Sequence, residues 1–173
     1  KFLTSVFYAA DLKIAADIAA VLGDSSEKGY RRRREEVISA IREEYVTPNG
    51  RVASDTMTAQ ALALHFDIVP QECKPALVQV LAENAAAHEY RVTTGFSGTP
   101  FLLFALADNG CFDTACKILM NEEYPGWLYE VKMGATTVWE RWDSLTPDGK
   151  PNPDGMNSYN PVSYTHLRAH ETV

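Results

Sequence analysis

One glutamate stands among tryptophans near the end of the chain. Glu140 lies between Trp139 and Trp142, and Trp127 is the third tryptophan of the sequence. The flat C–H faces of a sugar ring stack on tryptophan, while a carboxylate accepts hydroxyl hydrogens or activates water. The residue types therefore fit a carbohydrate site with a catalytic Glu140 and three substrate-binding tryptophans. From the residues alone, an equally good interpretation is a tryptophan-rich core corner in which Glu140 pairs with Arg141 or another cation.

The local pattern predicts how this stretch presents its residues. Thr136 or Thr137 can cap a short helix that carries the last two tryptophans as i, i+3 neighbours. Two Pro-Asp-Gly turns follow, and two asparagines lie after the second turn. We expect Asn157 to shape this loop. Asn160 has two possible roles: it can form hydrogen bonds with sugar hydroxyls, or it can also shape the loop.

The rest of the chain predicts antiparallel helical hairpins. Apolar residues recur at i, i+3 and i+4, turn residues separate the periodic segments, and no convincing strand is present. A cap at Ser54 or Asp55 is expected for the third helix, and Pro70 is expected to begin the fourth. The expected helices span 2–22, about 27–46, about 55–66, about 70–88, from 99 to the Asn109-Gly110 break, and from 111 or 113 to about 120.

Other signals are better explained by structure than by chemistry. The run Arg31–Arg34 is followed by Glu35 and Glu36, so i, i+4 pairing on a solvated helix face explains it better than nucleic acid does. His65 on an apolar helix is expected to be a core or rim residue rather than a ligand. Gly95 and Gly98 lack the spacing of a phosphate loop, and they are better explained as positions where the backbone approaches a neighbour closely. No cofactor and no metal site are expected.

The composition argues against some classes of binding partner. The 173 residues carry a net charge of −7, which argues against nucleic acid, and no apolar run is long enough for a membrane span. Three cysteines without CxxC spacing indicate free thiols in a reducing compartment, so we expect a cytoplasmic protein. The sequence leaves the oligomeric state unknown. Because the chain begins at Lys1 within an apolar pattern, we expect it to be a piece of a larger protein.

Several motifs together resemble a known family. The order TGFSGTPFLLFAL, DNGCFDTACKIL, EYPGWLYEVKMGATTVWERWDS and GMNSYN is similar to the C-terminal half of the catalytic domain of bacterial α-L-rhamnosidases, glycoside hydrolase family 78. The resemblance covers residues 2–160 and is most specific in GATTVWERWDS and GMNSYN. It implies an all-α fold, a partial (α/α)6 barrel, and hydrolysis of terminal α-L-rhamnose with inversion.

The resemblance also implies a role for one residue, and it shows where this sequence departs from the family pattern. The glutamate of ATTVWERW is the water-activating base of the family, which corresponds to Glu140, whereas nothing in the chain matches the motif that carries the acid. The family usually has a histidine where this sequence has Pro161, and residues 161–173 have no family character. We expect that tail to be an appended, poorly packed segment, and the His166 and His170 pair on it to be weak evidence for metal.

Two other functions remain open from the sequence. Helical-hairpin barrels also serve other glycosidases and polysaccharide lyases, and an acidic helical chain can be a non-catalytic interaction module. Because only one of two required carboxylates is present and half a barrel leaves apolar faces uncovered, we expect the isolated chain to be inactive.

Overall fold

The helices follow the predicted periodicity closely. In the computed structural model, which describes residues 1–161, the chain is all-α, with two isolated β-bridges and no strand among the described residues. The predictions made for the tail from 162 to 173, including His166 and His170, lie outside the described residues. The elements are α1 (Phe2–Leu22), α2 (Glu27–Tyr45), α3 (Met57–His65), the 3₁₀ helix η1 (Gln71–Cys73), α4 (Lys74–Ala87), α5 (Thr99–Ala107), α6 (Phe112–Leu119) and α7 (Trp127–Lys132).

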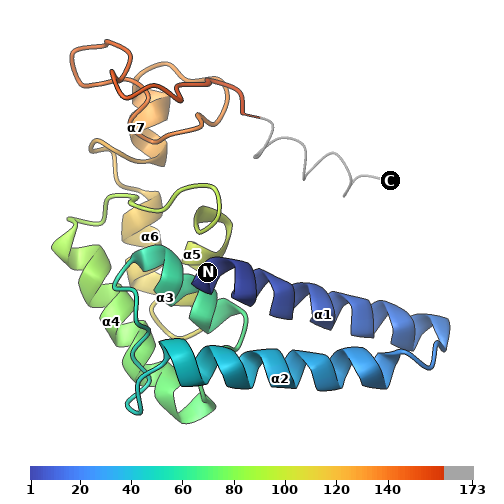
Figure 1. The fold of residues 1–173 in the computed structure, drawn as a ribbon. Coiled ribbons are helices and arrows are strands. Elements are labelled where there is room, and N and C mark those ends of the chain that lie inside the picture. Colours follow the sequence, from blue (N-terminus) through green and yellow to red (C-terminus); the bar gives the residue numbers. More distant parts are fainter. Residues whose placement is uncertain (162–173) are drawn as a thin grey trace.

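The first two helices form a long antiparallel hairpin (Figure 1). α1 ends at Gly23, whose φ of 67° is left-handed, and the N–H groups of Gly23 and Asp24 donate to the carbonyls of Ala20 and Ala19. This pair of bonds is the Schellman arrangement that glycine favours. On α2 the predicted pair of Arg32 with Glu36 forms at 3.7 Å, whereas Arg31 pairs with Glu27 at 2.8 Å and not with Glu35.

Two predicted helix starts are wrong by a few residues. The cap of α3 is Thr56, whose side-chain oxygen accepts the Ala59 N–H at 3.3 Å, rather than Ser54 or Asp55. Ser54 instead lies within hydrogen-bond distance of the Thr56 hydroxyl. Pro70 precedes the short helix η1, and the α-helix begins only at Lys74, with Pro75 in its first turn. In both cases a neighbouring residue of suitable chemistry takes the terminal position.

One continuous apolar core joins the hairpin to the shorter helices. α3 packs on α4 and α5, and α5 packs on α6, so the core runs through the centre of the molecule. Trp142 belongs to this same core and is 6% exposed, which anchors the C-terminal segment on the helices. The fully buried members include Val6, Met57, Leu62, Ile68, Leu81, Leu102, Leu106 and Ile118.

Glycine permits a close helix contact at the start of α5. A Cβ on Gly98 would lie 2.6 Å from Oγ1 and 2.8 Å from Cγ2 of Thr58 on α3. The predicted close approach therefore occurs at Gly98. At Gly95 a Cβ would meet nothing within 4 Å, so the prediction fails there. His65 is exposed and contacts the rings of Phe66 and Phe101, each at 4.9 Å between centroids, which fits the predicted rim position.

The C-terminal segment lies at one end of the molecule, beyond α6 (Figure 1). It contains α7, which the pattern did not predict, followed by turns and loops. The helix expected over Trp139 and Trp142 is absent, because the backbone there bonds across the loop instead. The Glu140 N–H donates to the Ser158 carbonyl at 2.8 Å, and the Thr137 hydroxyl donates to the Tyr159 carbonyl. None of the described helices has the length and apolar character that a membrane span needs.

Candidate active site

A hollow of about 300 Å³ lies beside Glu140. One wall is the segment 92–95 between α4 and α5, and the other is the segment 140–143. The two walls are joined, because the Trp142 indole N–H donates to the Thr94 carbonyl at 2.6 Å. The Thr94 hydroxyl in turn lies 2.8 Å from the Thr99 hydroxyl, in the first turn of α5. The helical core therefore fixes the hollow from both sides.

Glu140 is half-buried and is held by the loop that follows the second Pro-Asp-Gly turn. Its Oε2 accepts the Ser158 N–H at 3.3 Å, while its own N–H donates to the Ser158 carbonyl at 2.8 Å. This reciprocal pair fixes both the main chain and the carboxylate of Glu140. The carboxylate has acceptor positions beyond the one that Ser158 uses, and these can receive a proton from water or a hydroxyl.

The three tryptophans form two separate ring contacts. Trp127 packs on Trp142 with 4.9 Å between ring centroids, and Trp139 meets Tyr159 edge-to-face at 5.5 Å. Trp142 lines the hollow, but Trp139 is only 3% exposed. These contacts give the tryptophans packing roles behind the glutamate, and their predicted contact with a sugar stays a prediction.

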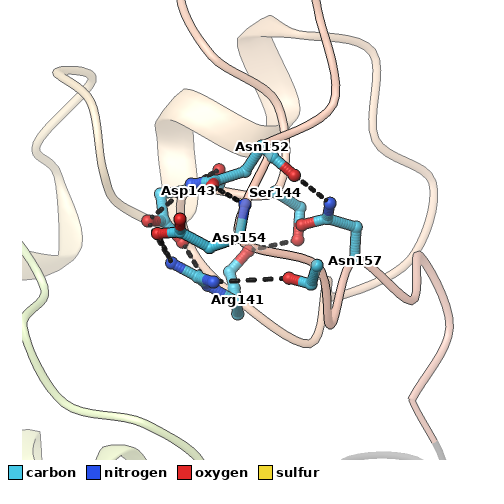
Figure 2. A network of polar contacts seen from close by, with 7 residues as sticks. Arg141, Asp143, Ser144, Asn152, Asp154 and Asn157 are labelled. Carbon is cyan, nitrogen blue, oxygen red and sulfur yellow. Dashed lines mark hydrogen bonds and ion pairs between the residues drawn. The ribbon is translucent and has the colours of Figure 1, made fainter.

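Arg141, which lines the hollow, also organises the segment 141–157 (Figure 2). Its guanidinium donates to both carboxylate oxygens of Asp143 at 2.9 Å and lies 3.8 Å from a carboxylate oxygen of Asp154. Asn152 donates to the Asp143 carboxylate at 3.0 Å and receives the Asn157 amide on its carbonyl at 2.6 Å. We call these five residues the Arg141 cluster. Arg141 pairs with Asp143 and Asp154, so the predicted alternative of a Glu140–Arg141 pair finds no support among the contacts.

The two asparagines of GMNSYN differ in their surroundings. Asn157 shapes the loop, as expected, through its bond to Asn152. Asn160 is exposed, and its main-chain N–H donates to the Ser158 hydroxyl at 3.4 Å. Its predicted role in substrate binding stays a prediction.

The sequence pattern does not predict one buried carboxyl group, that of Glu130 on α7. The residue is 3% exposed, and its Oε2 accepts the Trp139 N–H at 3.2 Å. Its Oε1 is buried and has no hydrogen-bond partner among the described residues. Burial raises the pKa of Glu130 from 4.5 to about 8, although the bond from Trp139 opposes this shift. Glutamate is usually a surface residue, so its type alone gave no signal of this burial.

No group of three or more possible metal ligands occurs among residues 1–161. The three cysteines carry free thiols. Among the described residues, the candidate site therefore combines the Glu140 carboxylate, the amide groups of the nearby asparagines and the buried rings of Trp139 and Trp142.

Comparison with known proteins identifies the family. The profile of the bacterial α-L-rhamnosidase 6 hairpin glycosidase domain matches residues 1–169. The chain belongs to this family. It is 35% identical over 162 residues to the α-L-rhamnosidase of Streptomyces avermitilis and 36% identical over 162 residues to that of Formosa agariphila. These matches cover 94% and 92% of this chain, but only 16% and 18% of the two relatives.

Solved α-L-rhamnosidases share the fold. The crystal structure of the Streptomyces avermitilis α-L-rhamnosidase complexed with L-rhamnose superposes with a TM-score of 0.88 at 34% identity, covering 94% of this chain and 16% of that one. The native Aspergillus terreus enzyme gives 0.86 at 32% identity, covering 92% of this chain and 19% of that one. The prediction of part of an (α/α)6 rhamnosidase domain is thus confirmed. Its position as the C-terminal half, and the boundary at residue 160, stay predictions.

Within this rhamnosidase domain the two most specific motifs meet in space. GATTVWERWDS supplies Glu140, and GMNSYN supplies the Ser158 that holds it. This chain thus contains a carboxylate whose position depends on both motifs.

Proposed function

We propose that this chain is part of an α-L-rhamnosidase that hydrolyses terminal α-L-rhamnosides with inversion, and that Glu140 is its general base. The observation that carries the proposal is the position of Glu140 on the hollow, with its Oε2 held by Ser158, in a chain of the rhamnosidase family. A relative with a TM-score of 0.88 binds L-rhamnose, and this supports L-rhamnosides as the substrates.

The proposed reaction needs two carboxyl groups on opposite sides of the glycosidic bond. Glu140 takes a proton from a water molecule, whose oxygen then attacks the anomeric carbon as the bond to the leaving oxygen breaks. A carboxylic acid protonates the leaving oxygen, and in inverting enzymes it lies about 6.5–9.5 Å from the base. Because water attacks the face opposite the leaving group, α-L-rhamnosides yield β-L-rhamnose.

We infer that the acid comes from outside this chain. Glu140 and Asp143 are the carboxyl groups that line the hollow among the described residues. Arg141 and Asn152 both donate to Asp143, which makes it a member of the Arg141 cluster rather than a proton donor to a substrate. With one of two required groups, the chain alone is expected to be inactive.

A hybrid enzyme tests the function. This chain replaces the matched segment of the Streptomyces avermitilis α-L-rhamnosidase, and release of rhamnose from an aryl α-L-rhamnoside is measured, with the unaltered relative as control. We expect turnover, and NMR of the first product is expected to detect the β-anomer. A hybrid that melts like the relative but releases no rhamnose contradicts the function, and the α-anomer as first product contradicts inversion.

The contacts of Glu140 disfavour the alternative of a helical interaction module. A module without catalysis has no use for a carboxylate that two loop motifs hold beside a hollow. Glu140 is half-buried next to the buried Trp139, rather than in open solvent far from the tryptophans.

A further inference from the structure

We propose that Glu130 is a positioning residue for the proposed base: its buried carboxyl group holds the backbone that delivers Glu140 to the hollow. This inference rests on the proposed function for its catalytic consequence. The hydrogen bond itself does not depend on that function.

Glu130 holds both ends of the loop that leads from α7 to Glu140. Its main-chain carbonyl accepts the Ala135 N–H at 3.0 Å, just after the helix ends. Its side-chain Oε2 accepts the N–H of Trp139, the residue immediately before Glu140, at 3.2 Å. Glu130 therefore holds the backbone at both the start and the end of this loop.

The side-chain bond lies in a dry environment. Glu130 is 3% exposed and Trp139 is also 3% exposed, so water cannot replace the carboxyl oxygen as acceptor without opening the loop. A buried N–H left without an acceptor costs about 1–3 kcal/mol. Removal of this acceptor is therefore expected to shift the loop towards conformations in which the Trp139 N–H reaches water.

The loop after Glu140 is held by a different residue. The Glu140 N–H donates to the Ser158 carbonyl, and the Ser158 N–H donates to the Glu140 carboxylate. Glu130 thus holds the backbone before the base, and Ser158 holds the base itself. In the absence of the Glu130 bond, Ser158 is expected to keep Glu140 near the hollow but with a less defined orientation, which lowers turnover more than substrate affinity.

Charge is not what this hydrogen bond requires. Burial raises the pKa of Glu130 to about 8, so the group is largely uncharged at neutral pH. An uncharged carboxyl accepts the Trp139 N–H through its carbonyl oxygen, as the amide oxygen of glutamine does. Glutamine should therefore replace Glu130, whereas methionine of similar length should not, because it lacks a strong acceptor. Simple filling of space would make the two substitutions equivalent.

The test uses Glu130→Gln and Glu130→Met in the hybrid enzyme, with the exposed Glu123→Met as the matched control. Hydrogen exchange of the amides at 133–142 and the kcat and KM for an aryl α-L-rhamnoside are measured for each variant. For E130M we expect exchange at Trp139 and Glu140 to be about 10-fold faster or more, because the Trp139 N–H no longer has an acceptor. We also expect kcat to fall about 10-fold or more with KM nearly unchanged. E130Q and E123M should stay within about threefold of the unaltered hybrid.

The outcomes separate this inference from the proposed function. Unchanged exchange in E130M overturns the positioning role, as does an equal loss of kcat in E130Q and E130M. Faster exchange in E130M with full kcat shows a hydrogen bond without catalytic consequence, and this also overturns the inference. A folded hybrid that is inactive before any substitution, yet has the expected exchange pattern, contradicts the proposed function and leaves the Glu130 bond established. If E130M does not fold, the exchange of the unaltered hybrid carries the test: the Trp139 amide should be protected, and free exchange of this amide in the folded hybrid overturns the positioning role.

Discussion

The Ser158 N–H lies 3.3 Å from Oε2 of Glu140, and the Glu140 N–H lies 2.8 Å from the Ser158 carbonyl oxygen. Two segments 18 residues apart in the chain thus hold each other at the candidate base. The relationship explains why a loop without regular secondary structure can fix a carboxylate: reciprocal bonds replace those that a helix or strand supplies.

Removal of the Ser158 N–H should impair the base. Ser158→Pro has no N–H to donate, so we expect kcat of the hybrid enzyme to fall about 10-fold or more. Ser158→Ala keeps the N–H and loses an exposed hydroxyl, which among the described residues accepts only the Asn160 N–H at 3.4 Å, so it should retain kcat within about twofold. Steady-state kinetics of the two variants test this pair of bonds. Equal activity of both contradicts a role for the Ser158 main chain.

The Arg141 cluster should stabilise the segment that follows Glu140. Arg141→Ala removes a two-point bond to Asp143 and is expected to cost about 1–2 kcal/mol of the free energy of unfolding. Lys150→Ala breaks the exposed pair with Asp148 and should cost less than about 0.5 kcal/mol. Urea unfolding of the chain gives both values. A loss for R141A no larger than that for K150A contradicts the assignment.

Gly98 should not tolerate a side chain. In Gly98→Ala the new Cβ meets Thr58, and we expect a destabilisation of about 1–3 kcal/mol. Thr58→Ala removes both close atoms, so the double variant should recover part of the loss. Gly29→Ala is the control, because it lies within α2 with open space around it and should be neutral or stabilising. Thermal unfolding of the four variants measures the coupling, and purely additive losses contradict a direct clash.

Glu130 should make stability depend on pH. Its pKa is raised from 4.5 to about 8 on folding, so the folded chain retains a proton that the unfolded chain releases. The stabilising contribution is complete below about pH 4.5 and is lost as pH rises through about 8, by at most about 1.4 kcal/mol per pH unit. Urea unfolding of the wild type and Glu130→Gln across this range gives the difference. If the wild type gains stability relative to E130Q with rising pH, the sign is contradicted.

Local sequence signals predicted the helical scaffold but not the geometry around the base. The apolar period of 2–22 and the left-handed preference of glycine placed α1 and its end at Gly23, because both causes act within a few residues. The region of Glu140 has no helix, because the Glu140 N–H donates to the carbonyl of Ser158. No local sequence pattern indicates a partner so far along the chain.

The same dependence on distant contacts explains why the sequence does not predict the role of Glu130. Glu130 has the residue type of a surface position, and only the tertiary contact with Trp139 reveals a buried acceptor. The tryptophan cluster was found by type and spacing, but its division into two ring pairs required the fold.

The turnover of Glu140→Gln in the hybrid enzyme tests most directly whether Glu140 is the general base. Glutamine keeps an oxygen that accepts the Ser158 N–H, so the loop should hold and the melting temperature should stay close to that of the unaltered hybrid. It cannot take the proton from water, so we expect kcat for an aryl α-L-rhamnoside to fall by about 10²–10⁴-fold. Glu123→Gln is the exposed control and should keep full activity. Near-normal turnover of E140Q would contradict the account.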